Sequence, residues 1–367
     1  MDSEKEGNDQ LELGKLTLEE IWQIPSMLSR NLKFKDEIHE AAEMIIEKDL
    51  QDIFLTGDGT SYHAGFVSAY TFNQLAKIKT YVQVSPEFGY LHSYILDEDD
   101  LVIGISQSGE SEMTIQAVKD GRERNASTMS VTNTPNSTLS KIADFELELR
   151  SGEEKSVLAT KTYINTIGVL NRLAIEVAYL RGELNEDAYD TVLDELKAIP
   201  KAIEFSLPNI RKQIKGIAPY FKFASNCFVL GSGPDYGAAL EASLKLKEGS
   251  RLFSQAYSTA EFPHGPITLA DESSWILAMI PPEKGQRRDM ILKLLKKVKK
   301  RGATVTGITA QDYSEDVLDM NIHVPKVAEN FQPFLNIIPV QLLSVELAIQ
   351  KGINPDKPKF LSKISSV

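Results

Sequence analysis

Three titratable side chains fall on one face of a helix that we expect over residues 235–249. Glu241, Lys245 and Glu248 stand at positions i, i+4 and i+7, which lie on the same side of an α-helix. Carboxylates beside an ammonium group can move protons as general acid or base. The same spacing is also typical of a solvated surface with an ordinary Glu–Lys pair. The remaining Leu, Ala and Ser residues leave this helix poor in surface charge, which favours chemistry without excluding the other interpretation.

A histidine follows this helix in the segment 260–266, which reads Ala-Glu-Phe-Pro-His-Gly-Pro. Because His264 lies between two prolines, we expect it on a rigid turn rather than inside a helix. An imidazole held there can serve as acid or base near neutral pH. A loop histidine with a structural hydrogen bond explains the residue equally well. Lys363, five residues from the end, is by default a solvated lysine of the tail.

Two loops have the composition of a phosphate site. Residues 57–61 read Gly-Asp-Gly-Thr-Ser, and residues 106–111 read Ser-Gln-Ser-Gly-Glu-Ser. Each loop stands between a strand and a helix, where backbone N–H groups and the helix dipole favour an anion. Hydroxyl groups add donors, although Ser and Thr are also ordinary helix caps. Two such loops favour phosphate, and they carry five hydroxyls, those of Thr60, Ser61, Ser106, Ser108 and Ser111.

A dinucleotide is the alternative ligand for these loops, and the sequence fits it less well. The motif Gly57-x-Gly59 continues with Tyr62 where a dinucleotide fingerprint has its third glycine. The motif Gly231-x-Gly233 likewise continues with Tyr236. A Gly-Lys-Ser/Thr sequence for a nucleoside triphosphate is absent from the chain.

The elements that must position these residues alternate between short apolar runs and stretches of helical period, which is the pattern of a parallel α/β sheet. In the first half we expect strands at residues 53–57, 80–84, 101–105, 127–132 and 144–149, with helices at 62–77 and up to Arg122. In the second half we expect strands at 228–231, 275–280 and 303–308, with helices at 235–249 and 286–301.

The two halves repeat one another. Gly57 and Gly231 are 174 residues apart, and so are Leu101 and Trp275. Two anchors at one offset indicate a duplicated domain. A helix-rich stretch over 162–216, which we expect Pro200 and Pro208 to interrupt, joins the two copies.

Composition restricts the function further. The 40 basic and 52 acidic residues give a net charge of −12, which argues against nucleic acid or an anionic membrane as partner. A single cysteine, Cys227, excludes an internal disulfide and a cysteine-based zinc site, and the five histidines have no metal-ligand spacing. We find no apolar run of the roughly 20 residues that span a bilayer and no basic leader. We therefore expect a cytoplasmic protein.

Several motifs together resemble the double sugar isomerase (SIS) domain family, in particular the isomerase part of glucosamine-6-phosphate synthase. In order along the chain they are Gly-Asp-Gly-Thr-Ser-Tyr (57–62), Ser-Pro-Glu-Phe (85–88), Ser-Gln-Ser-Gly-Glu-Ser (106–111), Val-Leu-Ala-Thr-Lys (157–161), Ala-Leu-Glu-Ala-Ser-Leu-Lys-Leu-Lys-Glu (239–248), His-Gly-Pro (264–266) and Leu-Ser-Lys (361–363). The tail over 354–363 is also similar to shorter archaeal relatives that act as glucosamine-6-phosphate deaminases.

This resemblance implies a role for each matching residue. Glu248 is the base that moves a proton between C1 and C2, Lys363 lies over the open-chain sugar and can form an imine, and His264 assists ring opening from the neighbouring subunit. Lys245 and Glu241 support charge and orient the histidine. The residues implied to hold the 6-phosphate are Thr60, Ser61, Ser106, Gln107, Ser108 and Ser111, and those beside the sugar are Val157 and Ala159. The family implies a homodimer without metal or redox cofactor.

Four features depart from the family pattern. The chain begins Met-Asp-Ser-Glu rather than with the glutaminase domain and its N-terminal cysteine nucleophile, so we expect no glutaminase activity. Pro263 replaces a lysine and Ala159 replaces a serine, both on the sugar side. Ser111 replaces a threonine. The identity of the sugar derivative therefore stays open.

We expect an α/β protein of two tandem, doubly wound, three-layer SIS domains with parallel sheets. The expected divisions are an N-terminal arm and helix (1–35), the first domain (36–185), a helical linker (186–216), the second domain (217–352) and a tail (353–367). The leading function is deamination and isomerisation of glucosamine 6-phosphate to or from fructose 6-phosphate and ammonia. The alternatives are a fructosamine-6-phosphate deglycase and a sugar-phosphate sensor without turnover.

Overall fold

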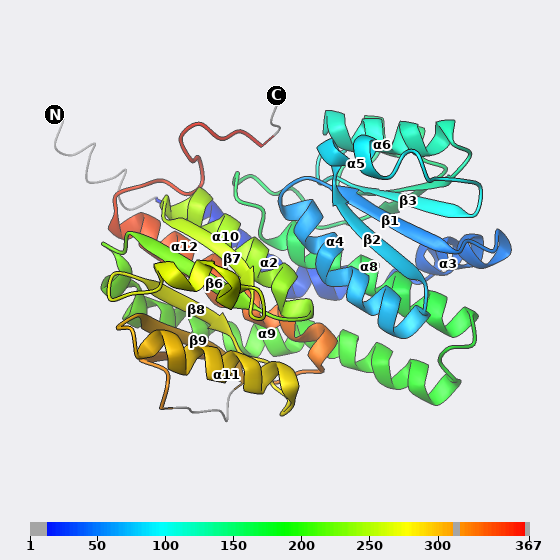
Figure 1. Ribbon diagram of the computed structural model, residues 1–367. Coiled ribbons are helices and arrows are strands. Elements are labelled where there is room, and N and C mark those ends of the chain that lie inside the picture. Colours follow the sequence, from blue (N-terminus) through cyan, green and yellow to red (C-terminus); the bar gives the residue numbers. More distant parts are fainter. Residues whose placement is uncertain (1–12, 311–315, 364–367) are drawn as a thin grey trace, which may run out of the picture. The chain divides into compact units, whose positions relative to one another are not determined.

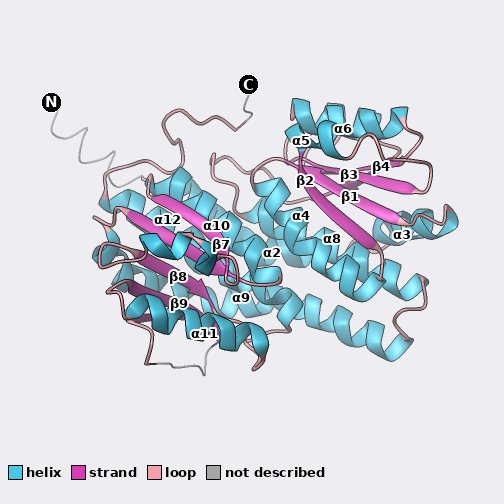
Figure 2. Cartoon of the chain, in the orientation of Figure 1, coloured by secondary structure: helices cyan, strands magenta, loops and turns pink. Residues whose placement is uncertain are grey.

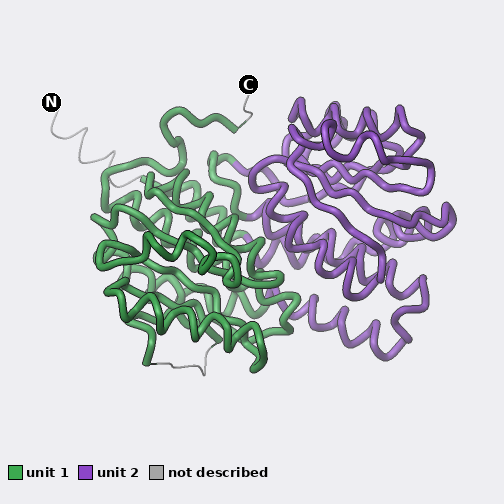
Figure 3. The backbone as a smooth tube through the Cα atoms, viewed as in Figure 1, with its two compact units in different colours: residues 1–23, 155–160, 201–363 green, residues 24–154, 161–200, 364–367 purple. Residues whose placement is uncertain are grey.

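The computed structural model describes residues 13–310 and 316–363, and these fold into two compact units (Figure 3). Within the described ranges, unit 1 comprises the residues up to Gln23, Lys155–Thr160 and Lys201–Lys363. Unit 2 comprises Ile24–Glu154 and Lys161–Pro200. The short segment Lys155–Thr160 thus belongs to unit 1, although its neighbours on both sides belong to unit 2.

Unit 2 is built on a five-stranded parallel sheet of order β2-β1-β3-β4-β5 (Figures 1 and 2). Strands β3 and β4 are buried along their whole length, as expected for a sheet covered on both faces. The strands are β1 (Asp52–Gly57), β2 (Lys79–Val84), β3 (Asp100–Ile105), β4 (Ser127–Thr132) and β5 (Phe145–Glu148).

Alternating side chains of this sheet form two separate cores. Ile53 and Leu55 of β1 pack on one face, whereas Phe54 between them packs on the other. The first core also receives α3 (Asp36–Glu47), α4 (Thr60–Thr71), the π-turn Phe72–Ala76 and α8 (Lys161–Leu180). The second receives α5 (Ser85–Leu91), α6 (Glu112–Glu123) and α7 (Thr138–Ile142). Unit 2 is therefore a three-layer α/β/α structure.

Unit 1 holds a second five-stranded parallel sheet, of order β10-β9-β8-β6-β7. Its strands are β6 (Asn226–Gly231), β7 (Phe253–Ser258), β8 (Trp275–Met279), β9 (Thr304–Ala310) and β10 (Met320–Val324). Helix α10 (Pro234–Ser250) packs against α12 (Gln332–Gln350), and α11 (Gln286–Lys299) contributes to a core with β6, β8 and β9. Short 3-10 turns lie at Phe262–His264, Pro266–Leu269 and Glu329–Phe331.

The duplication predicted from the sequence is confirmed in the register of the two sheets. Strand β1 begins at Asp52 and β6 at Asn226, 174 residues later. Strand β2 begins at Lys79 and β7 at Phe253, again 174 residues later. Strands β7 and β10 were not predicted from the sequence, although the offset itself points to β7. The alternating polar residues of β7 conceal it, because it is an edge strand with exposed positions.

Two further helices are α2, which spans Lys15–Asn31, and α9, which spans Glu186–Phe221. The expected interruption of the linker at Pro200 and Pro208 is wrong, because α9 continues through both prolines. A continuous stripe of buried residues supports the helix across them, namely Leu196, Ile199, Ile203, Leu207, Ile210 and Ile214.

Helix α12, with the turn before it, is long and apolar enough to cross a membrane by length and composition alone. This run is Glu329–Gln350, and 94% of its most apolar window is buried inside the protein. The expectation that no apolar run reaches this length is therefore wrong. The burial is that of a core helix, since α12 packs along α10.

Candidate active site

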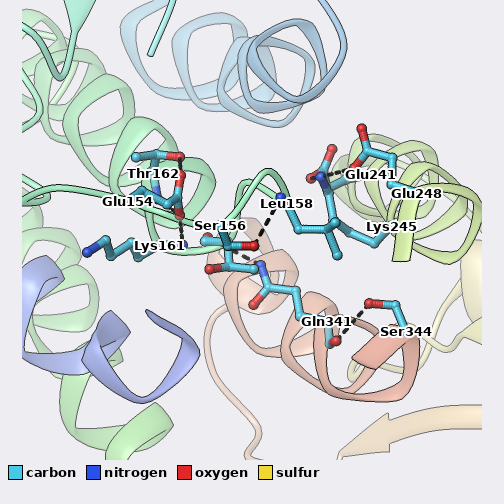
Figure 4. Close-up of polar contacts among 11 residues, drawn as sticks. Glu154, Ser156, Leu158, Lys161, Thr162, Glu241, Lys245, Glu248, Gln341 and Ser344 are labelled. Atoms are coloured by element: carbon cyan, nitrogen blue, oxygen red, sulfur yellow. Dashed lines mark hydrogen bonds and ion pairs between the residues drawn. The ribbon is translucent and has the colours of Figure 1, made fainter. Parts of the chain in front are cut away.

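The three titratable residues of α10 form a compact cluster in unit 1 (Figure 4). The Nζ atom of Lys245 lies 3.3 Å from Oε1 of Glu241 and 2.5 Å from Oε2 of Glu248. Lys245 and Glu241 are 1% and 0% exposed, whereas Glu248 is 17% exposed. A solvated helix face is therefore excluded for these residues.

Electrostatics keeps the central lysine charged. Burial is the largest influence on the pKa of Lys245 and lowers it, but the attraction of Glu241 and Glu248 together outweighs burial and raises this pKa above its ordinary value. One ammonium thus lies between two glutamate side chains. Glu248 is the member that solvent or a substrate can reach, which suits a general base.

His264 ends a 3-10 turn, Phe262–His264, and its side chain is exposed. The expectation of a turn between the two prolines is confirmed. Within the described part of the chain no hydrogen bond restrains its imidazole. Glu241, expected to orient the histidine, forms an ion pair with Lys245.

The two hydroxyl-rich loops lie next to one another in unit 2. They follow β1 and β3, which are paired neighbours with Gly57 opposite Ile105. Both therefore open at the carboxyl edge of the sheet, the usual ligand position in such folds. Gly59 has a φ of +49° at the start of α4, and Gly109 has a φ of +68° with Ser137 where a side chain would lie. The glycines thus permit backbone turns that other residues disfavour.

The hydroxyls of the second loop are already arranged. Ser106 accepts a hydrogen bond from the Gly109 N–H at 3.1 Å, and Ser108 accepts one from the Glu110 N–H at 3.2 Å. Each of these two hydroxyls keeps its own proton for donation to an anion. Thr60, Ser61 and Gln107 are half-buried at the same edge.

The two acidic residues of the loops behave differently. The Glu110 carboxylate accepts from the Thr138 N–H and hydroxyl at the start of α7, and these bonds lower its pKa. The Asp58 carboxylate accepts the Ser111 hydroxyl at 2.6 Å. The Ser111 hydroxyl is therefore free to donate to an anion only after it leaves Asp58, a residue that sequence reasoning did not single out.

The segment Lys155–Thr160 alternates between buried and partly exposed side chains. Ser156, Leu158 and Thr160 are buried, whereas Val157 and Ala159 are half-exposed. Leu158 packs against α10 at Gly249, next to Glu248, and Gln341 of α12 donates to the Thr160 carbonyl (Figure 4). Val157 and Ala159, the two residues expected beside the sugar, thus form the accessible face of the segment Lys155–Thr160, which packs against α10.

The C-terminal tail is anchored by Asp356, which is 5% exposed. Its carboxylate accepts from the N–H groups of Leu16 and Thr17 and from the Thr17 hydroxyl, at 3.2, 2.9 and 2.7 Å. Its carbonyl accepts from the Val157 N–H at 3.1 Å. Lys363, seven residues further on, is exposed.

Sequence reasoning missed Asp356. The available signal was Asn354-Pro355-Asp356, in which the Asn354 side chain accepts the Asp356 N–H in a local turn.

Among the residues that the structure describes, no group of three or more His, Cys, Asp and Glu side chains could hold a metal ion. Cys227 is buried in β6, and burial raises the pKa of its thiol. The chemistry available from these residues is proton transfer, imine formation and anion binding.

Comparison with known proteins agrees with this architecture. The SIS domain model matches twice, over residues 44–176 and 221–351. A glutamine–fructose-6-phosphate aminotransferase (isomerizing) from Clostridium tetani is 35% identical over 343 residues, which are 93% of this chain and 55% of that protein. The chain thus spans about half the length of this relative.

Solved structures show the same fold. The C-terminal domain of glucosamine-fructose-6-phosphate aminotransferase from Francisella tularensis has a TM-score of 0.87 and 28% identity, covering 93% of this chain and 98% of that one. A glucosamine-6-phosphate deaminase from Thermotoga maritima has a TM-score of 0.75 and 24% identity, covering 95% and 99%. With two matched domains and two parallel sheets in one register, the chain belongs to the SIS domain family and is homologous to the isomerase part of glucosamine-fructose-6-phosphate aminotransferase.

Proposed function

We propose that this protein converts glucosamine 6-phosphate and water into fructose 6-phosphate and ammonia, in either direction. The observation that carries the proposal is the buried cluster of Glu241, Lys245 and Glu248. Binding a phosphate requires none of these charges, and burying them costs free energy that their ion pairs offset only in part, which favours a chemical role for them. Homology to sugar-phosphate isomerising enzymes supports the substrate class.

The proposed chemistry needs two proton transfers and one hydrolysis. His264 assists opening of the sugar ring. Glu248 then takes the proton from C2 and returns it to C1, while the C1 oxygen gains a proton and the amine nitrogen loses one, so that the C1 aldehyde becomes an alcohol and the C2 amine becomes an imine. Water adds to this imine and ammonia leaves. Lys363 can first exchange with the imine nitrogen, releasing ammonia and forming a lysine–ketose imine that water then cleaves.

The loops after β1 and β3 would hold the 6-phosphate of the same substrate. Fixing this distant, unreactive group positions C1 and C2 for the base and contributes to the rate by orientation. We also propose a cytoplasmic homodimer in which each subunit supplies His264 to the other.

The first test is incubation of the purified protein with glucosamine 6-phosphate while ammonia and fructose 6-phosphate are followed together. We expect both products in equal amounts. Glu248→Gln should reduce the rate by about 10²- to 10⁴-fold, the usual contribution of a positioned base. The matched control is Glu272→Gln, an exposed change in unit 1 outside the cluster. Binding of fructose 6-phosphate without any turnover of the amino sugar would contradict the proposal.

A second candidate is a deglycase, which converts a fructosamine 6-phosphate and water into glucose 6-phosphate and an amine. It uses the same base and the same imine hydrolysis, but its leaving group is larger than ammonia. A hollow that borders Glu248 favours this candidate.

A further inference from the structure

The first hydroxyl-rich loop, residues 57–61, places a carboxylate beside the hydroxyls of the second loop, residues 106–111. The Asp58 carboxylate accepts the Ser111 hydroxyl at 2.6 Å, and the Thr114 hydroxyl lies 3.4 Å from the same carboxylate oxygen. Asp58 is half-buried and Thr114 is fully buried. The side chain of Asp58 therefore reaches from one loop to the other, at the edge of the sheet proposed for the 6-phosphate.

This carboxylate lies at a place that favours an anion. Ser111 directly precedes α6, and the N–H groups and dipole at the start of a helix attract negative charge. Asp58 already supplies one negative charge there, and neither loop contains a lysine or an arginine that could offset a second. A phosphate bound between the loops thus has a carboxylate as a close neighbour.

The other charged groups around the loops do not remove this conflict. Within the described residues, Asp58 forms no ion pair. Of the two nearby cations, Lys141 acts on Glu110, and Lys161 donates to the Glu153 carbonyl at 2.6 Å. The titratable groups on the elements that surround Asp58 are Tyr62 and His63 of α4, Glu87 of α5, Glu110 and Glu112 at the start of α6, Lys141 of α7 and Lys161 of α8.

The protonation state of the phosphate decides whether Asp58 attracts or repels it. A phosphate monoester has a second pKa of about 6, so it is a monoanion with one P–OH group in mild acid and a dianion without one above neutral pH. An ionised carboxylate only accepts hydrogen bonds. Asp58 can therefore accept the P–OH of the monoanion, whereas it can only repel the dianion. Two acids that share a site in this way favour the form that keeps one proton between them.

We infer that Asp58 makes phosphate binding proton-linked, so that the bound phosphate and Asp58 retain one proton between them. This inference rests on the proposed function and adds to it a regulation of the 6-phosphate site by pH. The affinity for a sugar phosphate should fall as pH rises above about 6, because the free phosphate then loses the proton that the complex retains. Without Asp58, neutral donors and the helix N-termini would favour the dianion, and the pH dependence would have the opposite sign.

The test measures the Kd of fructose 6-phosphate with the full chain by titration calorimetry in the absence of ammonia. Between about pH 6 and 8, we expect Kd to rise with pH, by at most about tenfold per pH unit, which is the limit for one linked proton. Sulfate is the second probe, because it stays a dianion throughout and brings no proton. We expect sulfate to bind more weakly than the sugar phosphate in mild acid.

Two variants assign the pH dependence to Asp58. Asp58→Asn should bind fructose 6-phosphate about tenfold more tightly than the unaltered protein near pH 8, since a like charge has been removed, and its Kd should no longer rise with pH. Its amide oxygen can still accept the Ser111 hydroxyl, so we expect the fold to be retained, which circular dichroism checks. Glu112→Gln removes an exposed carboxylate next to Ser111 and should keep the rise of Kd with pH.

Three results overturn the inference and leave the proposed function standing. The first is a Kd of the unaltered protein that is constant or falls as pH rises. The second is an Asp58→Asn variant whose Kd still rises with pH, and the third is a Glu112→Gln variant that loses the rise as Asp58→Asn does. Failure of the unaltered protein to bind fructose 6-phosphate at any of these pH values contradicts instead the phosphate site of the proposed function.

Discussion

The two SIS copies share strand order and register but differ in the loops at the ends of their strands. After β1 and β3, copy one has hydroxyl-rich loops with open hydrogen-bond donors. At the same offset in copy two, Asp235 takes the place of Ser61, and Ile280-Pro281-Pro282 take the place of Ser106-Gln107-Ser108. The fold thus retained its topology while the two crevices acquired different chemistry.

The crevice of copy two is closed by its own charges. The guanidinium of Arg287 lies where a side chain on Gly233 would be, donates to the Ser232 carbonyl and pairs with Glu329. The carboxylate of Glu329, which is already present there, repels a phosphate. The titratable cluster of copy two lies instead towards the far end of α10, where Lys245 contacts its two carboxylates. Under the proposed function, one copy binds the phosphate and the other transfers the proton.

Removing the central cation of copy two should have the largest effect. Lys245→Met removes the cation that pairs with two carboxylates, one of them fully buried, and breaking a buried ion pair costs about 3–5 kcal/mol. We expect that loss in the free energy of unfolding, measured with urea near neutral pH.

Two further variants check the cause. Lys293→Met on the exposed side of α11 should change stability by less than about 0.5 kcal/mol. Adding Glu241→Gln to Lys245→Met should recover part of the loss. Unchanged stability in Lys245→Met would show that the cluster is solvated in solution.

The second prediction concerns Asp235, the counterpart of Ser61. Burial raises the pKa of Asp235 to about 7, more than a hydrogen bond from Asn336 lowers it. The folded state therefore binds this proton more tightly than the unfolded chain, so the residue makes stability fall as pH rises from about 4 to 7.

Asp235→Asn should remove this slope. We expect the variant to match the original protein near pH 4, about the ordinary pKa of an aspartate. Between about pH 4 and 7 its advantage should grow, with a ceiling on the order of 1.4 kcal/mol per pH unit. Denaturant titrations at several pH values measure this. A constant difference across that range would mean that Asp235 is not the titrating group.

Much of the fold could be predicted from the sequence. The spacing of apolar residues indicates which faces are buried, and the 174-residue offset indicates the duplication. The continuity of α9 through its two prolines could not be predicted. Proline disfavours the interior of a helix, but here a long stripe of buried residues, which only the tertiary structure creates, stabilises the helix. Whether Glu241, Lys245 and Glu248 are buried could not be predicted, since i, i+4 spacing is the same on a solvated face and on a buried face of a helix. Asp356 was missed because its partners, Leu16 and Thr17, are about 340 residues away in sequence.

The third prediction tests the binding role of copy one. Ser108→Ala removes a hydroxyl that can donate to the phosphate, and hydrogen bonds to charged groups contribute about 1.5–3 kcal/mol. We expect KM for glucosamine 6-phosphate to rise about 10- to 100-fold with kcat little changed. Pro282→Ala, at the counterpart position of copy two, should leave KM as it was. Equal effects of the two changes would contradict the division of labour between the copies.

The smallest effect should come from Asp356→Asn, which tests whether the proton-transfer side depends on a correctly held tail. Asparagine keeps the size of the side chain, but a neutral oxygen is a weaker acceptor for Leu16, Thr17 and the Thr17 hydroxyl. Loosening this anchor should let Lys363 and the Val157 strip move, so kcat should fall about three- to tenfold, as about 1 kcal/mol implies. Binding of inorganic phosphate in unit 2 should not change. A fall in stability with normal kcat would assign Asp356 to folding alone, whereas a fall in kcat at unchanged phosphate affinity would show that the two copies are tuned independently.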